Sequence, residues 1–155
     1  MTNRVKPIPE DYQSAMPMLA IQDAAAAIEF YQQAFNATEL MRFTEPDGKI
    51  AHAEIEIGNA RIMIADEYPE YNTSPQSLGG STVTIHLYVE DVDASIAQAT
   101  AAGAKLLHPV EDQFYGDRTG QIADPFGHVW MLATHREDVL PDQVQQRFTD
   151  LCRKS

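Results

Sequence analysis

The sequence predicts an α+β fold made of two copies of one βαβββ module joined in tandem. Three observations indicate the duplication, because a helix-capping aspartate, a helix-ending residue and an apolar strand each occur twice in the same order. The paired landmarks are Asp23 and Asp91, Asn36 and Gly103, and Ile62–Ala65 and Trp130–Ala133. The two aspartates lie 68 positions apart, and so do the two strands.

The first module is expected at residues 11–71. An apolar run before Asp23 predicts a strand, and the aspartate can cap the helix that follows. That helix should end at Asn36, because asparagine readily adopts the left-handed conformation of a helix C-terminus. The expected elements are a strand at Ala15–Ile21, a helix at Ala24–Phe35, and strands at Thr38–Phe43, Ile50–Ile57 and Arg61–Ala65.

The second module is expected at residues 82–137 and repeats this order. Asp91 should cap its helix and Gly103 should end it. Asp124-Pro125-Phe126-Gly127 has the residues that a type I turn favours, and it separates the last two strands. The expected elements are a strand at Val83–Val89, a helix at Ala94–Ala102, and strands at Lys105–Val110, Gly120–Ala123 and Val129–Thr134.

The residues outside the modules carry weaker patterns. Residues 72–81 are polar with paired glycines, which predicts a linker, and residues 138–155 predict a tail with a helix beginning at Pro141. Cys152 is the only cysteine, so no internal disulfide is possible and a reducing compartment fits. The N-terminus has prolines and acids where a signal peptide would need an apolar core, so we expect a cytoplasmic protein.

The charge of the chain limits its partners. There are 23 acidic residues against 11 lysines and arginines, which gives a formal net charge of −12. Nucleic acids and anionic membranes need a basic patch, and the sequence has no such cluster. No apolar stretch approaches the roughly 20 residues of a membrane-spanning helix. We therefore expect neither partner; the charge favours solubility and, in a sharper interpretation, attraction of a cationic ligand.

Alternation along the strands assigns side chains to the two faces of each sheet. From Val83 onward the aliphatic residues should face the helix, while Thr84, His86 and Tyr88 face the other way. Trp130 should lie in the core beneath the helix. The helix-free faces are also predicted to carry four of the six methionines, which are Met16, Met18, Met63 and Met131. Flexible thioethers there would suit a broad apolar pocket, although methionine more often fills a core.

These residues match a known family. The duplicated βαβββ pattern, the helix AIEFYQQAF, the stretch QFYGDR and the turn DPFGHVW resemble the vicinal oxygen chelate superfamily, which includes glyoxalases, bleomycin resistance proteins and dioxygenases. The resemblance covers roughly residues 11–137 and is nearest to the PhnB-like branch. It implies an eight-stranded cupped mixed sheet with helices outside, a small-molecule ligand in each cup, and a homodimer.

Metal-dependent members of the family draw ligands from four equivalent strand positions. Counting from the capping aspartates and the DPxG turn transfers these positions to four residues of this chain, Met16, Met63, Thr84 and Met131. Thioethers and a hydroxyl are poor ligands for hard or borderline divalent ions, which favour carboxylate or imidazole. We therefore expect no cofactor at the usual positions. A register shift of two residues on one strand would bring in His86 instead.

A second metal site remains open as an alternative. His52, Glu54 and Glu56 alternate along one strand and, together with His86, could form a non-standard site for a divalent metal. The same spacing also fits a solvated strand face, which we favour. His86 could equally act as a general base or be a hydrogen-bonded core histidine. His108, His128 and His135 are expected to be exposed at strand ends or turns.

The stretch Phe114–Arg118 is expected to form a loop over the ligand. Tyr115 could stack on a planar molecule, and Arg118 could bind a carboxylate or phosphate. The alternative for Arg118 is a salt bridge to a nearby acidic residue. We favour the site role slightly, because loops on a rigid scaffold tend to carry function.

Three functions are compatible with the sequence, in this order. The first is a metal-free module that binds a small planar or cationic molecule. The second is a metal-dependent lyase, isomerase or dioxygenase that uses His52, His86 and Glu54 or Glu56. The third is a metal-free enzyme in which His86 is the general base and Arg118 holds an oxyanion. The sequence names no ligand and leaves open whether the protein is an enzyme.

Overall fold

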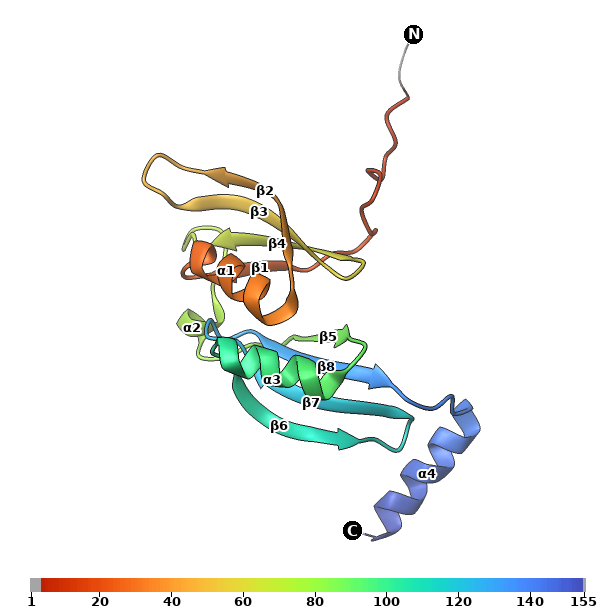
Figure 1. Cartoon of the computed structure of the whole chain (residues 1–155). Coiled ribbons are helices and arrows are strands. Elements are labelled where there is room, and N and C mark those ends of the chain that lie inside the picture. Colours follow the sequence, from red (N-terminus) through yellow and green to blue (C-terminus); the bar gives the residue numbers. More distant parts are fainter. Residues whose placement is uncertain (1–3, 155) are drawn as a thin grey trace. The chain divides into compact units, whose positions relative to one another are not determined.

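The chain forms two compact βαβββ units whose boundary lies between Gly79 and Gly80. The structure is a computed structural model and describes residues 4–154. In these residues eight strands form two four-stranded mixed sheets, one in each unit (Figure 1). The α+β prediction with two copies of one module is therefore confirmed. The boundary falls within the stretch that was expected to be a linker.

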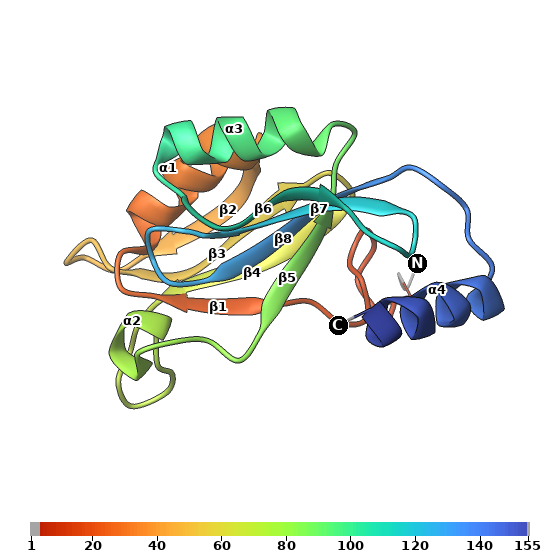
Figure 2. The same ribbon diagram turned by 90° about the horizontal axis from the view of Figure 1, so that it is seen from below.

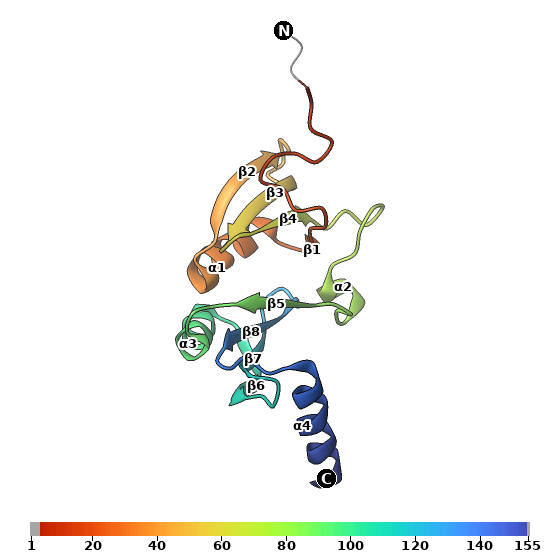
Figure 3. The same cartoon turned by 90° about the vertical axis from the view of Figure 1, so that its right-hand side faces the viewer.

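Unit 1 has the strand order β1-β4-β3-β2, with β1 and β4 parallel and the other pairs antiparallel. Its elements are β1 (Met18–Ile21), α1 (Ala24–Phe35), β2 (Thr38–Thr44), β3 (Ile50–Ile57), β4 (Ala60–Asp66) and a short α2 (Pro75–Leu78). Helix α1 lies against one face of the sheet (Figure 3), where the fully buried side chains of Tyr31, Ile55 and Ile64 form its core.

Unit 2 repeats this topology with the strand order β5-β8-β7-β6 and a parallel β5–β8 pair. Its elements are β5 (Thr84–Tyr88), α3 (Val92–Ala102), β6 (Lys105–Asp112), β7 (Asp117–Ala123), β8 (Val129–His135) and α4 (Pro141–Lys154). Helix α3 lies across β6, β7 and β8 (Figure 2). Trp130, Ile122 and Leu132 are fully buried, as expected for the tryptophan.

The helix ends agree with the caps read from the sequence. The Asp23 side chain accepts a hydrogen bond from the Ala26 amide, and Asp91 does the same from Ala94. Asn36 ends α1 in the left-handed conformation with φ 56°. Local hydrogen bonding of short polar side chains therefore sets where both helices begin, before any tertiary contact is considered.

A second anchor at each helix start was not foreseen. In unit 1 the Ala24 amide donates to buried Asp66 Oδ1 at 2.9 Å, and in unit 2 the Val92 amide donates to Thr134 Oγ1 at 2.8 Å. The two acceptors occupy equivalent positions at the end of the last strand of each repeat, so they tie helix and sheet together in the same way. Asp66 also accepts from the Ile50 amide at 2.6 Å, which joins the start of β3 to this anchor.

Several boundaries differ from expectation. The expected linker contains α2, capped by buried Ser74. Strand β1 begins at Met18, later than expected. Strand β7 begins at Asp117, three residues earlier than expected, because a tight turn at Gly116, where φ is 102°, returns the chain directly into the sheet. None of the helices among residues 4–154 is long and apolar enough to span a membrane.

Candidate functional site

The face of the unit 2 sheet opposite α3 carries a group of polar side chains from neighbouring strands of the sheet. Paired residues on neighbouring strands point to the same side of a sheet, and the pairs His86–Met131, Gln121–Met131, Thr119–Ala133 and Asp117–His135 therefore share this face. We call it the helix-free face. It is formed mainly by Thr84, His86, Tyr88, Asp117, Thr119, Gln121, Met131 and His135.

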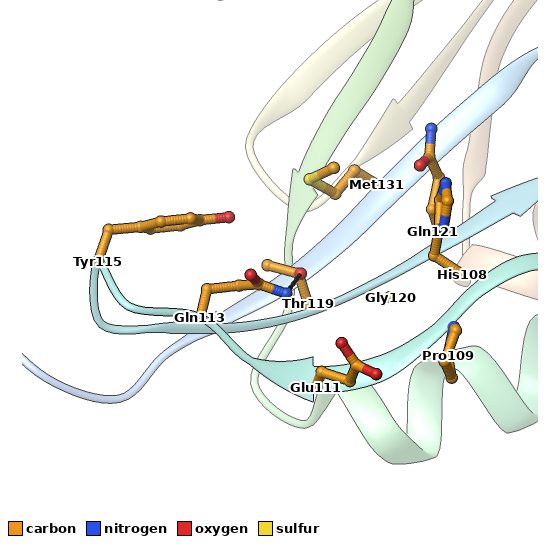
Figure 4. A pocket seen from close by; sticks show the side chains of 9 residues that line it. All are labelled: His108, Pro109, Glu111, Gln113, Tyr115, Thr119, Gly120, Gln121 and Met131. Atoms are coloured by element: carbon orange, nitrogen blue, oxygen red, sulfur yellow. Dashed lines mark hydrogen bonds between the residues drawn. The ribbon is translucent and has the colours of Figure 1, made fainter. Parts of the chain in front are cut away.

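A pocket of about 200 Å³ lies on this face between β6, β7 and β8. Figure 4 shows Tyr115 entering from the β6–β7 turn, with its hydroxyl end directed along the sheet toward Thr119 and Met131. Gln121 and His108 stand at the opposite end. The lining residues are His108, Pro109, Glu111, Gln113, Tyr115, Thr119, Gly120, Gln121 and Met131.

Polar and apolar side chains line the pocket together. Its lining has one carboxylate, Glu111, and no lysine or arginine. Gln113 Nε2 donates to Thr119 Oγ1 at 3.0 Å, which fixes the side of the pocket below Tyr115. An aromatic ring, a thioether and two amides can together hold a flat ligand and hydrogen-bond its edge.

A hydrogen-bonded cluster lies farther along the helix-free face. Asp117, only 4% exposed, accepts from the Tyr88 hydroxyl at 2.6 Å and pairs with His135 Nδ1 at 2.7 Å. His135 Nε2 pairs with Asp138 at 2.7 Å. The rings of His86 and Tyr88 have their centroids 4.8 Å apart. These contacts fix the Tyr88 hydroxyl and the His135 ring around one buried carboxylate.

Opposing effects set the pKa values in this cluster. Burial raises the pKa of the Asp117 carboxyl, but hydrogen bonds from Tyr88 and His135 outweigh it and hold that pKa below its ordinary value. Hydrogen bonds to Asp117 and Asp138 raise the pKa of His135. The hydrogen bond to Asp117, followed by burial, raises the pKa of Tyr88. An ionised Asp117 beside a protonated His135 is therefore favoured.

The pair predicts a defined dependence of stability on pH. The stability that protonated His135 contributes to the fold is fully present below the ordinary histidine pKa of 6.5, and it is lost as pH rises through the raised pKa. The stability that ionised Asp117 contributes to the fold is fully present above the ordinary aspartate pKa of 3.8, and it is lost as pH falls through the lowered pKa. We expect the difference in Tm between the wild type and His135→Gln to be largest between these two ordinary pKa values and to shrink as pH rises through the raised pKa of His135. Calorimetry at several pH values measures it, and a constant difference would contradict this assignment.

Strand pairing shows which residues of the helix-free faces lie opposite one another. Met131 lies opposite His86, whereas Thr84 lies opposite Val129. In unit 1 Met63 likewise lies opposite Met18, and Met16 precedes β1. The four positions transferred by counting, Met16, Met63, Thr84 and Met131, are therefore not cross-strand partners of one another. The pairs that face each other are thus Met18 with Met63 and His86 with Met131.

In unit 1 the residues His52 and Glu54 belong to an ion-pair cluster. Glu54 is 4% exposed, so its interpretation as part of a solvated strand face was wrong. Its Oε1 accepts from the Tyr12 hydroxyl at 2.5 Å and from Arg61 Nη1 at 3.0 Å, and its Oε2 pairs with His52 Nε2 at 2.8 Å. The Arg61 guanidinium also lies over the Tyr12 ring, 4.1 Å from its centroid.

The pKa of Glu54 reflects this arrangement. Burial alone raises the pKa, but the hydrogen bonds from Tyr12, His52 and Arg61 outweigh it and keep the carboxyl ionised. Both carboxylate oxygens already have partners, and Arg61 supplies the opposite charge. Glu54 is therefore explained as the centre of a structural ion pair.

The side chains do not fit a divalent metal site. No group of three or more histidine, cysteine, aspartate or glutamate residues within residues 4–154 is arranged to hold a metal ion. Within unit 1, His52 and Glu54 of the alternative set are paired with each other, and Glu56 is exposed on β3. The facing pairs supply three thioethers and one imidazole, which is not the donor set of zinc or iron sites.

Arg118 does not reach the pocket. It lies on β7 rather than in a loop, and its guanidinium donates to both oxygens of Asp93 on α3 at 2.8 and 3.0 Å and to Asp112 at 3.2 Å. It therefore points to the helix side of the sheet. The alternative considered for this residue, a salt bridge, is the arrangement observed.

The structure adds site residues that the sequence did not single out. Because β7 begins at Asp117, its alternation could have identified Thr119 and Gln121 on the same face. His108 lines the pocket, and His135 is half-exposed beside Asp117. His128 was expected to be exposed, but it is buried. No local sequence signal identifies Tyr12 or Arg61, because their roles depend on the contacts that both make with Glu54.

Comparisons with known proteins agree with this architecture. Residues 14–132 match the family model described as the Glyoxalase/Bleomycin resistance protein/Dioxygenase superfamily. The uncharacterized protein Mb0911c of Mycobacterium bovis is 47% identical over 133 residues, which are 83% of this chain and 88% of that protein.

Two solved structures illustrate the shared fold. TioX from Micromonospora sp. ML1 has a TM-score of 0.62 and 28% identity over 83% of this chain and 100% of its own. The PhnB protein from Bacillus cereus has a TM-score of 0.61 and 17% identity over 79% of this chain and 99% of its own, a likeness of fold. The chain belongs to the glyoxalase/bleomycin resistance protein/dioxygenase superfamily.

Proposed function

We propose that the pocket of unit 2 binds a small planar molecule that is neutral or cationic, without a metal at the positions the family usually employs. The observation that carries this proposal is the composition of the lining. Tyr115 and Met131 offer apolar contact to a flat ring, two glutamines and Thr119 offer hydrogen bonds, and Glu111 is the only charged group in the lining apart from a titratable histidine.

Charge and size both support this class of ligand. The formal net charge of −12 and the carboxylate of Glu111 favour a cation over an anion in the same place. Pockets for drug-sized molecules usually enclose roughly 300–1,000 Å³, whereas this one encloses about 200 Å³. It therefore suits a ligand, or part of one, of about two or three fused rings in size.

Binding can be tested with flat probes that differ in charge. Proflavine is a planar tricyclic cation, and 2-anthracenecarboxylate is a planar tricyclic anion. We expect proflavine to bind with a saturable fluorescence change and the carboxylate to bind about tenfold more weakly or not at all. Equal binding of both would remove the argument from charge, and the absence of binding in a wider screen of flat amines and heterocycles would refute the proposal.

Two substitutions separate stacking from charge. Tyr115→Ala should weaken proflavine binding by roughly five- to tenfold, because it removes the ring that faces the bound plane. Glu111→Gln should reduce the preference for the cation over the anion while retaining the shape of the pocket. Arg118→Gln is the control, since Arg118 is held on the helix side of β7, and it should leave both affinities unchanged.

Metal analysis distinguishes this function from metal-dependent catalysis. Under our proposal, protein purified without chelators should contain no stoichiometric zinc, nickel, manganese or iron, and removal of trace metal should not alter proflavine affinity. A stoichiometric metal whose removal abolishes turnover of a substrate would favour the lyase, isomerase or dioxygenase alternative. We also expect a homodimer, as the family resemblance implies, which light scattering on the purified protein measures.

A further inference from the structure

Helix α4 makes its contacts at the turn that carries Tyr115. None of its residues is buried, so it adds little to the core of unit 2. Yet Arg147 Nη1 donates to the carbonyl oxygen of Phe114 at 3.0 Å, and the Phe148 and Phe114 rings have centroids 5.5 Å apart. The helix thus engages both the backbone and the ring of the residue next to Tyr115.

The chain leading into α4 is fastened to the same turn. The carbonyl oxygen of Gly116 accepts from the Arg136 and Glu137 amides at 2.9 and 3.0 Å. Arg147 in turn donates to both oxygens of Glu137 at 3.1 and 2.8 Å. One arginine therefore links the turn to the segment that follows β8 and to α4.

The packing at Gly116 is too close for a side chain. A Cβ atom there would lie 2.2 Å from the Glu137 carbonyl oxygen, and φ at Gly116 is +102°. The turn and the 136–137 segment are therefore in backbone contact, which leaves little freedom for the turn while α4 is docked. The Phe114 and Tyr115 rings stand at 89° to each other with centroids 5.2 Å apart, so immobilising Phe114 restricts Tyr115.

We infer that α4 is a positioning element that holds Tyr115 over the pocket, with Arg147 and Phe148 as its positioning residues. The helix lies beyond residues 14–132, the part of the chain that matches the family model. It is thus an addition to the βαβββ unit, and it acts on one wall of the pocket. The consequence for ligand binding rests on the proposed function, whereas the effect on the turn does not.

The effect on the turn can be measured without a ligand. Arg147→Ala combined with Phe148→Ala removes the carbonyl contact, the ion pair and the ring contact while leaving the sheet intact. We expect the amides of Gly116, Arg136 and Glu137, which are bonded in or to the turn, to exchange hydrogen about tenfold faster. The resonance of 3-fluorotyrosine at Tyr115, assigned with Tyr115→Phe, should broaden or shift.

Matched variants show whether α4 acts through these contacts. Gln146→Ala is the control, because the Gln146 side chain donates to Asp150 on the same helix and not to the turn, and it should change neither signal. Arg147→Lys should restore part of the protection, because lysine keeps the charge opposite Glu137 but lacks the planar fork. Amide exchange in the core strand β8 reports whether the unit stays folded, and it should remain slow in every variant.

Binding provides the second measurement. If Tyr115 contacts the ligand, the double variant should weaken proflavine binding by about three- to tenfold, chiefly through faster dissociation. Unchanged turn exchange and an unchanged Tyr115 resonance in the double variant would overturn the inference. A loosened turn in a protein whose wild type binds no flat probe would refute the proposed function and leave the positioning role of α4 standing.

Discussion

Replacing Glu54 with alanine should destabilise unit 1 by roughly 3 kcal/mol, the lower end of the range for a broken buried ion pair. The substitution leaves the Arg61 guanidinium without its carboxylate and the Tyr12 hydroxyl without its acceptor. The Arg61 side chain keeps some contact with solvent, at 15% exposure, which limits the loss. Urea unfolding followed by circular dichroism measures the change.

The double replacement Glu54→Met with Arg61→Met tests the reason for this loss. Both charges leave together, so no uncompensated ion remains, and the double variant should be more stable than Glu54→Ala. The stability of Glu54→Gln should lie between those of Glu54→Ala and the double variant, because glutamine keeps an acceptor for Tyr12 but loses the charge. If all three variants were equally stable, the ion pair would have no net role. If Glu54→Gln released a bound metal, the carboxylate would instead be a ligand.

Replacing Asp66 with alanine should cost roughly 2–5 kcal/mol, because it leaves two buried amides, those of Ala24 and Ile50, without an acceptor. A buried unpaired amide costs about 1–3 kcal/mol, since water cannot replace the lost partner. The loss should be seen in the unfolding of unit 1, with the amide of Ala24 exchanging hydrogen much faster.

Thr134 provides a control for Asp66 within the same chain. It occupies the equivalent position in unit 2, but its hydroxyl accepts from only one helix amide, that of Val92. Thr134→Val should therefore cost less than Asp66→Ala, about 1–3 kcal/mol. Asp66→Asn should also cost less than Asp66→Ala, because its one remaining oxygen can serve one of the two amides. A larger loss from Thr134→Val than from Asp66→Ala would contradict this explanation of the anchor.

The local features of the fold could be read from the sequence because they depend on neighbouring residues. Asp23 and Asp91 cap the helices that follow them, and Asn36 ends the first. Each requires only a short polar side chain near free backbone groups. The repeat then predicted the order of the remaining strands along the chain, because an element recognised in one copy is expected at the equivalent position of the other. Trp130 was placed in the core by strand alternation alone.

Most of the site depends on contacts that no local pattern contains. Alternation put His52, Glu54 and Glu56 on one face, but Glu54 is enclosed by Tyr12, which is 42 residues away, and by Arg61 on the neighbouring strand β4. The QFYGDR stretch placed Tyr115 at the pocket, as the family resemblance implied.

The sequence by itself determined the duplicated module, its helix caps and the apolar face of each sheet, because hydrogen bonds and periodicity act over a few residues. The tertiary structure decided the pairing between strands. A shift of two residues keeps every side chain on the same face, so alternation could not distinguish Thr84 from His86 as the neighbour of Met131. Backbone pairing between β5 and β8 placed His86 opposite Met131. The pairing of β7 with β8 placed Arg118 opposite Thr134, on the side of the sheet where Arg118 reaches Asp93 of α3.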